Sequence, residues 1–153
     1  MQIFVPFVNT VDTAKILDQR RLNKQIIECR QVLKAIDQRK KGEKAAWMNH
    51  PVTIQYENYT EWLNWYTLTL EAVFRKNDFS ALLNSEPKRP PFIGDDSYHK
   101  QHRRRLYDKD NKHYDIFKDD MSTKEIENKV NYYCIPSNNG GYNIVKYLNG
   151  KKI

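Results

Sequence analysis

The sequence predicts a mainly α-helical protein with a single domain spanning residues 1–153. Two long segments, residues 14–36 and 54–74, repeat their apolar side chains at intervals of three and four, which is typical of a helix. Segments that could form strands are short and lie near the two ends of the chain. The sequence shows no internal repeat or low-complexity segment that would indicate another architecture.

The first predicted elements are an extended start and a long helix. Residues 1–8 are apolar and interrupted by a proline, which is typical of a short strand or of a segment pinned against the core. Residues 9–12 offer N-cap side chains for a helix that runs to about Ile36, either unbroken or in two parts with a break near Arg20. Residues 37–44 are polar and predict a connection.

An aromatic-rich helix is predicted next. Pro51 suits the first turn of a helix, with Asn49 or His50 as its cap, and apolar residues continue to about Lys76. These residues cover more than half of the helix circumference, so we expect the central helix of the fold at this point of the chain. Core packing is the favoured role of its aromatic side chains, and base stacking is the alternative for three of them: Tyr56, Tyr59 and Trp62.

The last third of the chain predicts two helices and two short extended segments. Residues 96–107 form a helix whose acidic first turn suits the helix dipole. A capping box at residues 122–125 opens a second, shorter helix. Residues 132–135 and 142–148 flank the turn sequence SNNGG, which predicts either a hairpin or a tail packed on the helices.

Composition narrows the class of partner. The chain has 26 Lys and Arg against 19 Asp and Glu, and the resulting net charge of +7 favours a polyanion, with nucleic acid the usual one. No apolar run reaches the roughly 18–20 residues of a membrane span, so we expect no membrane partner and a cytoplasmic location. Cys29 and Cys134 lack metal-type spacing, which is typical of a reduced compartment.

Residues 18–28 combine basic side chains with one carboxylate. Helical spacing places Arg21, Lys24 and Glu28 on one face. One interpretation is a solvated ion pair between Lys24 and Glu28. The other is a carboxylate set among cations and beside apolar positions that limit access of water.

Residues 99–114 form the most cationic part of the chain. His99, His102 and Arg103 fall within one helical turn, with Lys109 further along, and tyrosines flank the three consecutive arginines. This pattern favours a surface that follows DNA phosphates over a merely solvated face. Histidines at positions three apart also suit a metal, which predicts an alternative site of His50, His99 and His102.

Amine chemistry is the reaction that fits these residues best. An amine can attack C1′ of a deoxyribose to form a Schiff base, after which β-elimination cuts the strand. An α-amine such as that of Met1 has a lower ordinary pKa than a lysine side chain such as that of Lys24, so it needs less depression to be unprotonated at neutral pH. Glu28 is the candidate for the proton transfers.

The sequence is similar to the pyrimidine-dimer DNA glycosylase family, also called the phage endonuclease V family. Three segments carry the resemblance, and together with the N-terminal segment they are spread over residues 1–114: LDQRRLNKQIIE (17–28), WMNHPVTIQYENY (47–59) and PPFIGDDSYHKQHRRRLYDKDNKHY (90–114). The family resemblance implies a compact helical bundle with the N-terminal segment threading between helices. It also implies a catalytic pair of the N-terminal α-amine and Glu28, with Arg20 and Arg21 facing the DNA backbone.

One departure concerns the nucleophile. The dimer-specific enzyme exposes a small residue by losing its initiator Met, whereas Gln2 is large and predicts that Met1 is retained. The amine is therefore Met1 or, alternatively, Lys24. The residues predicted to bind DNA are Arg20, Arg21, His50, His99, His102, Arg103 and Lys109.

We expect an enzyme that cuts double-stranded DNA at damaged or abasic nucleotides, as a DNA glycosylase with AP lyase activity or as an AP-site nuclease, and without a cofactor. An AP-site nuclease would depend on a separate, uracil-removing DNA glycosylase of the host as partner. Two alternatives stay open. One is a metal-dependent DNA nuclease, and the other is a non-catalytic phage effector that binds DNA or a host repair enzyme.

Overall fold

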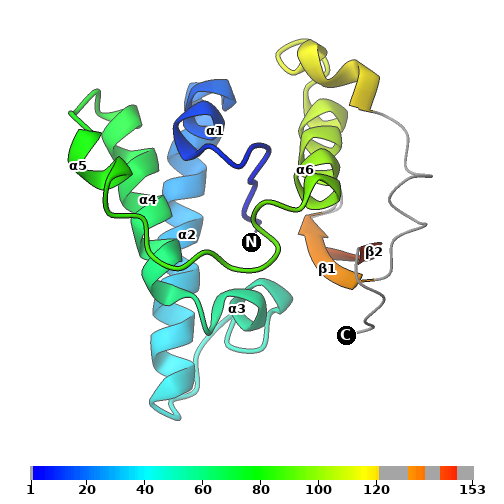
Figure 1. Ribbon diagram of the computed structural model, residues 1–153. Coiled ribbons are helices and arrows are strands. Elements are labelled where there is room, and N and C mark those ends of the chain that lie inside the picture. Colours follow the sequence, from blue (N-terminus) through cyan, green and yellow to red (C-terminus); the bar gives the residue numbers. More distant parts are fainter. Residues whose placement is uncertain (1, 121–130, 137–141, 148–153) are drawn as a thin grey trace. The chain divides into compact units, whose positions relative to one another are not determined.

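The computed structural model describes residues 2–120, 131–136 and 142–147, and most of its regular elements are helices (Figure 1). The mainly α class predicted from the sequence is confirmed. The chain packs as two units, the first made of Met1–Ile3 and Asn9–Pro90 and the second of Phe4–Val8 and Pro91–Ile153. The single domain and the threading of the N-terminal segment between helices stay predictions.

The first predicted helix forms as two helices in the first unit, α1 (Thr10–Ile16) and α2 (Gln19–Lys40). The Asn9 side chain caps α1 by accepting hydrogen bonds from two backbone N–H groups, as expected of an N-cap. Leu17 and Asp18 have extended backbone angles, with ψ of 133° and 155°. They separate the two helices close to the predicted break.

The aromatic-rich helix is also divided, into α3 (Pro51–Tyr56) and α4 (Thr60–Phe74), and a short α5 (Ser80–Leu83) follows. The predicted start at Pro51 is confirmed. The cap is His50, whose Nδ1 accepts a hydrogen bond from the Val52 backbone N–H.

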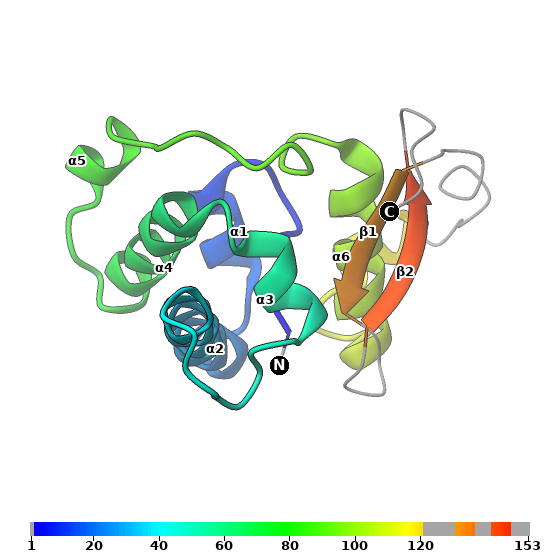
Figure 2. The same ribbon diagram turned by 90° about the horizontal axis from the view of Figure 1, so that it is seen from below.

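The core of the first unit lies where α2 packs against α4 (Figures 1 and 2). Trp62 is its largest side chain and stacks nearly parallel to two tyrosine rings, Tyr56 at 6.3 Å and Tyr66 at 5.1 Å between centroids. Core packing is therefore confirmed for Tyr56 and Trp62. The other fully or nearly buried apolar residues of these two helices are Leu22, Ile26, Cys29, Val32, Ala35, Ile36, Leu63, Trp65 and Leu70.

The second unit contains α6 (Asp96–Lys109), the 3-10 helix η1 (Asp115–Asp120), and strands β1 (Asn131–Pro136) and β2 (Tyr142–Tyr147). The strands pair antiparallel, from Asn131 opposite Tyr147 to Pro136 opposite Tyr142, so the hairpin alternative is confirmed. Both η1 and β1 pack against α6. The short helix predicted after the capping box lies outside the described residues.

Residues 2–6 are buried without regular secondary structure, which confirms a pinned segment in place of a strand. Ile3 belongs to the first unit and is 2% exposed. Phe4 and Val5 belong to the second unit and are 3% and 1% exposed. Within that unit the Phe7 ring contacts Phe117 edge-on, at 5.7 Å between centroids.

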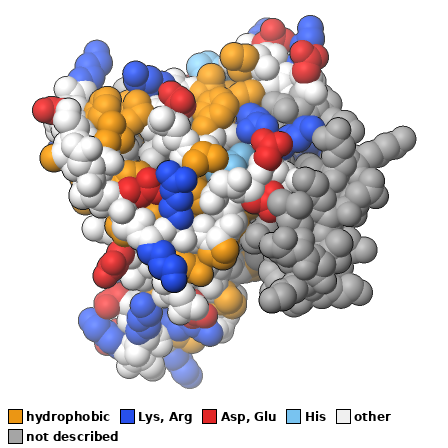
Figure 3. Space-filling model, in the orientation of Figure 1, with side chains coloured by type: hydrophobic (Ala, Val, Ile, Leu, Met, Phe, Trp, Pro, Cys, Tyr) orange, Lys and Arg blue, Asp and Glu red, His pale blue; other side chains and the backbone are white. Residues whose placement is uncertain are grey.

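The described surface mixes charges of both signs. In the space-filling view, Lys and Arg side chains lie among Asp and Glu side chains (Figure 3). Several are paired at the surface, such as Arg39 with Glu57 at 3.0 Å. None of the described helices combines the length and the hydropathy of a membrane-spanning segment.

Candidate active site

Glu28, the predicted proton-transfer residue, lies on the buried face of α2 and is 9% exposed. Its helical neighbours on that face are Gln25, one turn earlier, and Val32, one turn later, which are 1% and 0% exposed. Restricted access of water strengthens the hydrogen bonds that such a carboxylate accepts.

The start of the chain meets Glu28 directly, within the first unit. The backbone N–H of Gln2 donates a hydrogen bond to Oε2 of Glu28 over 3.1 Å, between residues 26 positions apart in sequence. Gln2 is 8% exposed, so both ends of this bond are shielded from solvent. Met1, which carries the α-amine, lies outside the described residues.

Gln25 completes this arrangement and was missed in the sequence. Its Nε2 donates to the carbonyl oxygen of Gln2 at 2.7 Å and to Oε2 of Glu28 at 3.3 Å. One side-chain amide therefore holds the first described peptide group and the carboxylate together. The available signal was the spacing of three between Gln25 and Glu28, which makes them neighbours on a helix.

Lys24, the alternative amine, is exposed on α2. Among the described contacts, it forms no ion pair with Glu28, although helical spacing permits one. The interpretation of a solvated Lys24–Glu28 pair therefore finds no support in the described part of the chain, where Glu28 bonds to Gln2 and Gln25 instead.

Arg20 and Arg21 lie in the first turn of α2. Arg20 is exposed and makes no hydrogen bond or ion pair to another described residue. Arg21 is partly buried and pairs with the helix cap Asp18 at 3.0 Å. Pairs near the surface contribute little to stability, so the Arg21 guanidinium can exchange Asp18 for a ligand at a small energetic cost.

His99 and His102, predicted to contact DNA, are buried in the second unit, at 2% and 0% exposure. Nδ1 of His99 lies 2.7 Å from the Val5 carbonyl oxygen, and its Nε2 accepts from the Gly94 N–H at 2.9 Å. Nδ1 of His102 accepts from the Val5 N–H at 3.0 Å. Both rings hold the protein's own backbone, a placement that does not match the expected contact with phosphates.

Burial also decides the charge of His102. It lowers the pKa of this side chain well below its ordinary value, and the nearby His99 and Arg103 lower the pKa further. His102 is therefore neutral, with Nδ1 as acceptor, and the proton lies on Nε2.

Arg103 lies in the same turn of α6 as His102, and its side chain contacts other residues of the second unit. Its Nη1 donates to the Pro6 carbonyl oxygen at 2.9 Å, and its guanidinium carbon lies 6.0 Å from the centre of the Phe7 ring. The Arg103 side chain is 14% exposed and the Arg105 side chain 16%. The Arg103 and Arg105 side chains of the expected phosphate-following surface are thus mostly shielded from solvent.

The two remaining predicted DNA-binding residues lie in different units. His50 is partly buried in the first unit as the cap of α3, and burial lowers its pKa. Its ring packs edge-on against Trp47 at 5.5 Å. Lys109 is exposed at the last turn of α6 in the second unit.

The described residues contain no group of three or more His, Cys, Asp and Glu side chains arranged to hold a metal ion. Of the histidines in the metal alternative, His50 belongs to the first unit, and His99 and His102 to the second. Cys29, adjacent to Glu28, is fully buried, and burial raises its pKa to about 12. Its thiol therefore stays protonated and does not serve as a nucleophile at neutral pH.

Comparison with known proteins identifies one family. The family model described as pyrimidine dimer DNA glycosylase matches residues 1–80. This match covers Gln2, Gln25 and Glu28 together with Arg20 and Arg21. No curated protein and no solved structure matches the chain.

Proposed function

The chain belongs to the pyrimidine dimer DNA glycosylase family, and we propose that it is a repair enzyme that removes damaged bases from double-stranded DNA. We assign the chemistry to Glu28 and the α-amine of Met1. The observation that carries this assignment is the hydrogen bond from the Gln2 N–H to Glu28. Only the Cα and the carbonyl carbon of Met1 separate its α-amine from that nitrogen along the chain, which supports the choice of the α-amine over Lys24 as the nucleophile.

In the first step, the unprotonated amine attacks C1′ of the damaged nucleotide. The bond from nitrogen to C1′ forms, the glycosidic bond breaks, and the base leaves with its electron pair and takes up a proton. Glu28 accepts the proton that the amine loses. An α-amine suits this role because its ordinary pKa is about 7.7–8.0, against about 10.4 for lysine, so more of it is unprotonated at neutral pH.

In the second step, the deoxyribose ring opens. The C1′–O4′ bond breaks, Glu28 returns its proton to O4′, and a Schiff base remains at C1′. Removal of a C2′ proton then expels the 3′ phosphate oxygen, which cuts the strand by β-elimination. Hydrolysis of the Schiff base releases the enzyme.

The second step also operates on DNA that has already lost a base. There the C1′ aldehyde condenses with the amine and releases water, giving the same Schiff base. An abasic site left by a separate uracil-DNA glycosylase is therefore a substrate of this proposed lyase step. A host glycosylase would act first and leave the abasic site, and the two enzymes would not need to contact each other.

We assign the phosphate contacts to Arg20 and Arg21, which lie at the start of the helix that carries Glu28. The net charge of +7 supports binding to DNA in general, through release of counterions from the phosphates. His99, His102 and Arg103 are left out of this assignment because their side chains bond the backbone of residues 5 and 6.

Borohydride trapping tests the proposal. Purified protein is incubated with duplexes that contain a pyrimidine dimer or an abasic site, and the Schiff base is reduced to a stable amine. We expect a covalent protein–DNA adduct with both duplexes and none with undamaged DNA. Absence of an adduct on either lesion would refute the amine mechanism.

Two sets of variants assign the residues. Glu28→Gln is expected to lower strand cleavage about 10²- to 10⁴-fold, the usual contribution of acid–base catalysis, while Glu61→Gln at an exposed position of α4 leaves it unchanged. Acetylation of the α-amine is expected to abolish trapping, and Lys24→Arg to preserve it. Trapping that survives acetylation of the α-amine and is lost in Lys24→Arg would identify Lys24 as the nucleophile.

A further inference from the structure

In the second unit, side chains of α6 hold the backbone of Val5 and Pro6. Nδ1 of His102 accepts a hydrogen bond from the Val5 N–H at 3.0 Å, and Nδ1 of His99 lies 2.7 Å from the Val5 carbonyl oxygen. Nη1 of Arg103 donates to the Pro6 carbonyl oxygen at 2.9 Å. Because proline has no N–H, these three side chains satisfy every backbone polar group of the two residues.

The two histidines act on Val5 through opposite tautomers. Nε2 of His99 accepts from the Gly94 N–H at 2.9 Å, so the proton of this ring lies on Nδ1, which donates to the Val5 carbonyl oxygen. His102 carries its proton on Nε2 and accepts through Nδ1. A donor and an acceptor, three positions apart on one helix, thus bond Val5 as a neighbouring strand would. They explain how Val5 stays buried without regular secondary structure.

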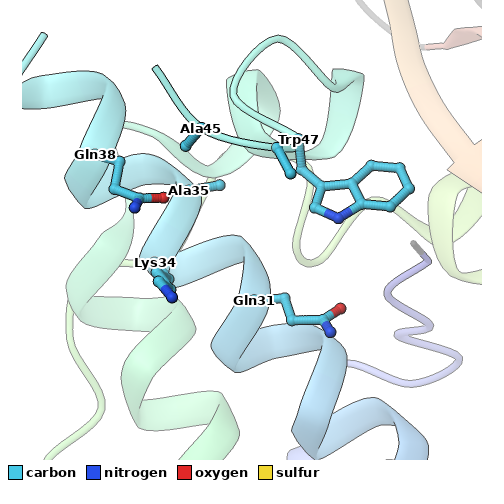
Figure 4. Close-up of a pocket in the computed structure, with 7 residues that line it drawn as sticks. Gln31, Lys34, Ala35, Gln38, Ala45 and Trp47 are labelled. Atoms are coloured by element: carbon cyan, nitrogen blue, oxygen red, sulfur yellow. The ribbon is translucent and has the colours of Figure 1, made fainter. Parts of the chain in front are cut away.

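Gln2 is held in the same manner in the first unit. Its N–H donates to Oε2 of Glu28 at 3.1 Å, and its carbonyl oxygen accepts from Nε2 of Gln25 at 2.7 Å. This use of a glutamine is not general on α2. The side chains of Gln31 and Gln38 line a hollow of about 300 Å³ and bond no other described residue (Figure 4).

Ile3 and Phe4 are the only residues between these two held points of the chain. They are 2% and 3% exposed. Since an extended chain spans at most about 3.6 Å per residue, Val5 lies within about 11 Å of Gln2. A backbone that is fixed at Val5 therefore leaves few conformations to the residues before it.

We propose that His99 and His102 are positioning residues for the α-amine of Met1. They hold Val5 and, through the short chain before it, limit the positions from which the amine meets Glu28. The proposal deepens the proposed function and rests on it, because that function names the amine as the nucleophile. It gives both histidines a role in the rate of the reaction and none in contact with DNA.

Steady-state kinetics on an abasic duplex tests this role with the full-length protein. His102→Leu removes the acceptor for the Val5 N–H, so kcat is expected to fall about 10- to 100-fold while KM stays unchanged. His102→Asn is the rescue variant, because its side-chain oxygen replaces Nδ1 as acceptor, and its kcat should match that of wild type. Leu106→Ala is the matched control. It removes a fully buried side chain of the same helix and keeps the bonds to Val5, so it should lower the melting temperature and leave kcat unchanged at temperatures well below melting.

Two insertions test the same role without removing a hydrogen-bonding side chain, and they stay informative if His102→Leu does not fold. A glycine between Ile3 and Phe4 lengthens the chain that joins Gln2 to Val5 by up to about 3.6 Å, and it should lower kcat as His102→Leu does. A glycine between Val8 and Asn9 lies beyond Val5 and should leave kcat at the wild-type value.

The order parameter of the Gln2 N–H, measured by ¹⁵N relaxation, reports the position of the chain start without any reaction. It is expected near the value of about 0.85 for rigid backbone in wild type, and to fall toward about 0.6 in His102→Leu and in the insertion after Ile3. An unchanged order parameter in both variants would overturn the proposal, as would a kcat that Leu106→Ala lowers as much as His102→Leu does. Absence of a borohydride-trapped adduct with wild type would refute the proposed function instead, so the two failures are distinguishable.

Discussion

Nε2 of Gln25 lies 2.7 Å from the carbonyl oxygen of Gln2, and this hydrogen bond ties the start of the chain to α2. The same nitrogen lies 3.3 Å from Oε2 of Glu28. Gln25 is only 1% exposed, so water competes little for either bond. One amide therefore positions the peptide that follows the proposed nucleophile and the carboxylate proposed to take its proton.

Gln25→Leu should impair catalysis more than binding. The substitution removes both hydrogen bonds, so the start of the chain loses its fixed distance from Glu28. A misplacement of about 1 Å can cost about 10²-fold in rate. We expect a fall of that order in kcat for strand cleavage with little change in KM, measured by steady-state kinetics on abasic duplex.

The matched control is Gln19→Leu, at an exposed position of the same helix, which should behave as wild type. Gln25→Glu gives a second readout. It places a second carboxylate beside Glu28, and because like charges oppose ionisation, the acidic limb of the pH–rate profile should move to higher pH. An unchanged profile would mean that position 25 does not act on Glu28.

Glu28→Leu should destabilise the fold where Glu28→Gln does not. Leucine leaves the buried N–H of Gln2 without its acceptor, at a cost of about 1–3 kcal/mol in the free energy of unfolding. Glutamine keeps an acceptor oxygen at the same place. Urea unfolding of the two variants beside wild type checks this, and equal stabilities would show that the Gln2–Glu28 bond contributes nothing to folding.

The stability of the protein should fall below about pH 6.5 because of His102. Its pKa is depressed in the folded state by burial and by the nearby His99 and Arg103, whereas the unfolded chain titrates near 6.5. Below pH 6.5 the unfolded state therefore binds a proton that the folded state does not. The loss is at most about 1.4 kcal/mol per pH unit and continues down to the folded pKa.

His102→Asn isolates this contribution, since the asparagine side-chain oxygen replaces Nδ1 as acceptor for the Val5 N–H but does not titrate. Urea unfolding at pH 7.5 and 5.0 should show a smaller difference for this variant than for wild type. Equal differences for the two proteins would assign the acid sensitivity to other groups.

Arg20 and Arg103 should separate DNA binding from folding. Arg20 is exposed and without a described partner, so Arg20→Ala should weaken DNA binding, reduce its logarithmic salt slope by about 1 and leave the melting temperature unchanged. Arg103 bonds the Pro6 carbonyl oxygen, so Arg103→Ala should instead cost about 1.5–3 kcal/mol of stability. Fluorescence anisotropy across a salt series and thermal melts check the pair. If only Arg103→Ala lowered the salt slope, Arg103 rather than Arg20 would be the residue that contacts DNA phosphates.

Much of the fold was predictable because its signals are local. Asn9, His50 and Pro51 mark helix starts through their own side chains, and the apolar spacing of residues 14–36 and 54–74 marks the helices that follow. The breaks between α1 and α2 and between α3 and α4 were harder to place. There the apolar pattern continues across the break, and only the packing of each segment decides where the helix is interrupted.

The candidate site residues divide along the same line. Glu28 was proposed from a pattern on one helix, in which a carboxylate sits among cations. Gln25 was missed because its role depends on Gln2, 23 positions away. His99 and His102 were expected on an exposed face because of their cationic neighbours in sequence, whereas contact with residue 5, 94 and 97 positions away, holds both rings inside.

By itself, the sequence determined the helical class, the helix starts, the net positive charge and the family, since each depends on composition or on residues within a few turns of one another. Tertiary structure alone decided which of the charged side chains face the protein and which face solvent. It set the α6 histidines on the backbone of residue 5, brought the start of the chain to Glu28 and left Trp47 at the surface. Burial and hydrogen bonding between distant segments control these outcomes, and neither is encoded in local spacing.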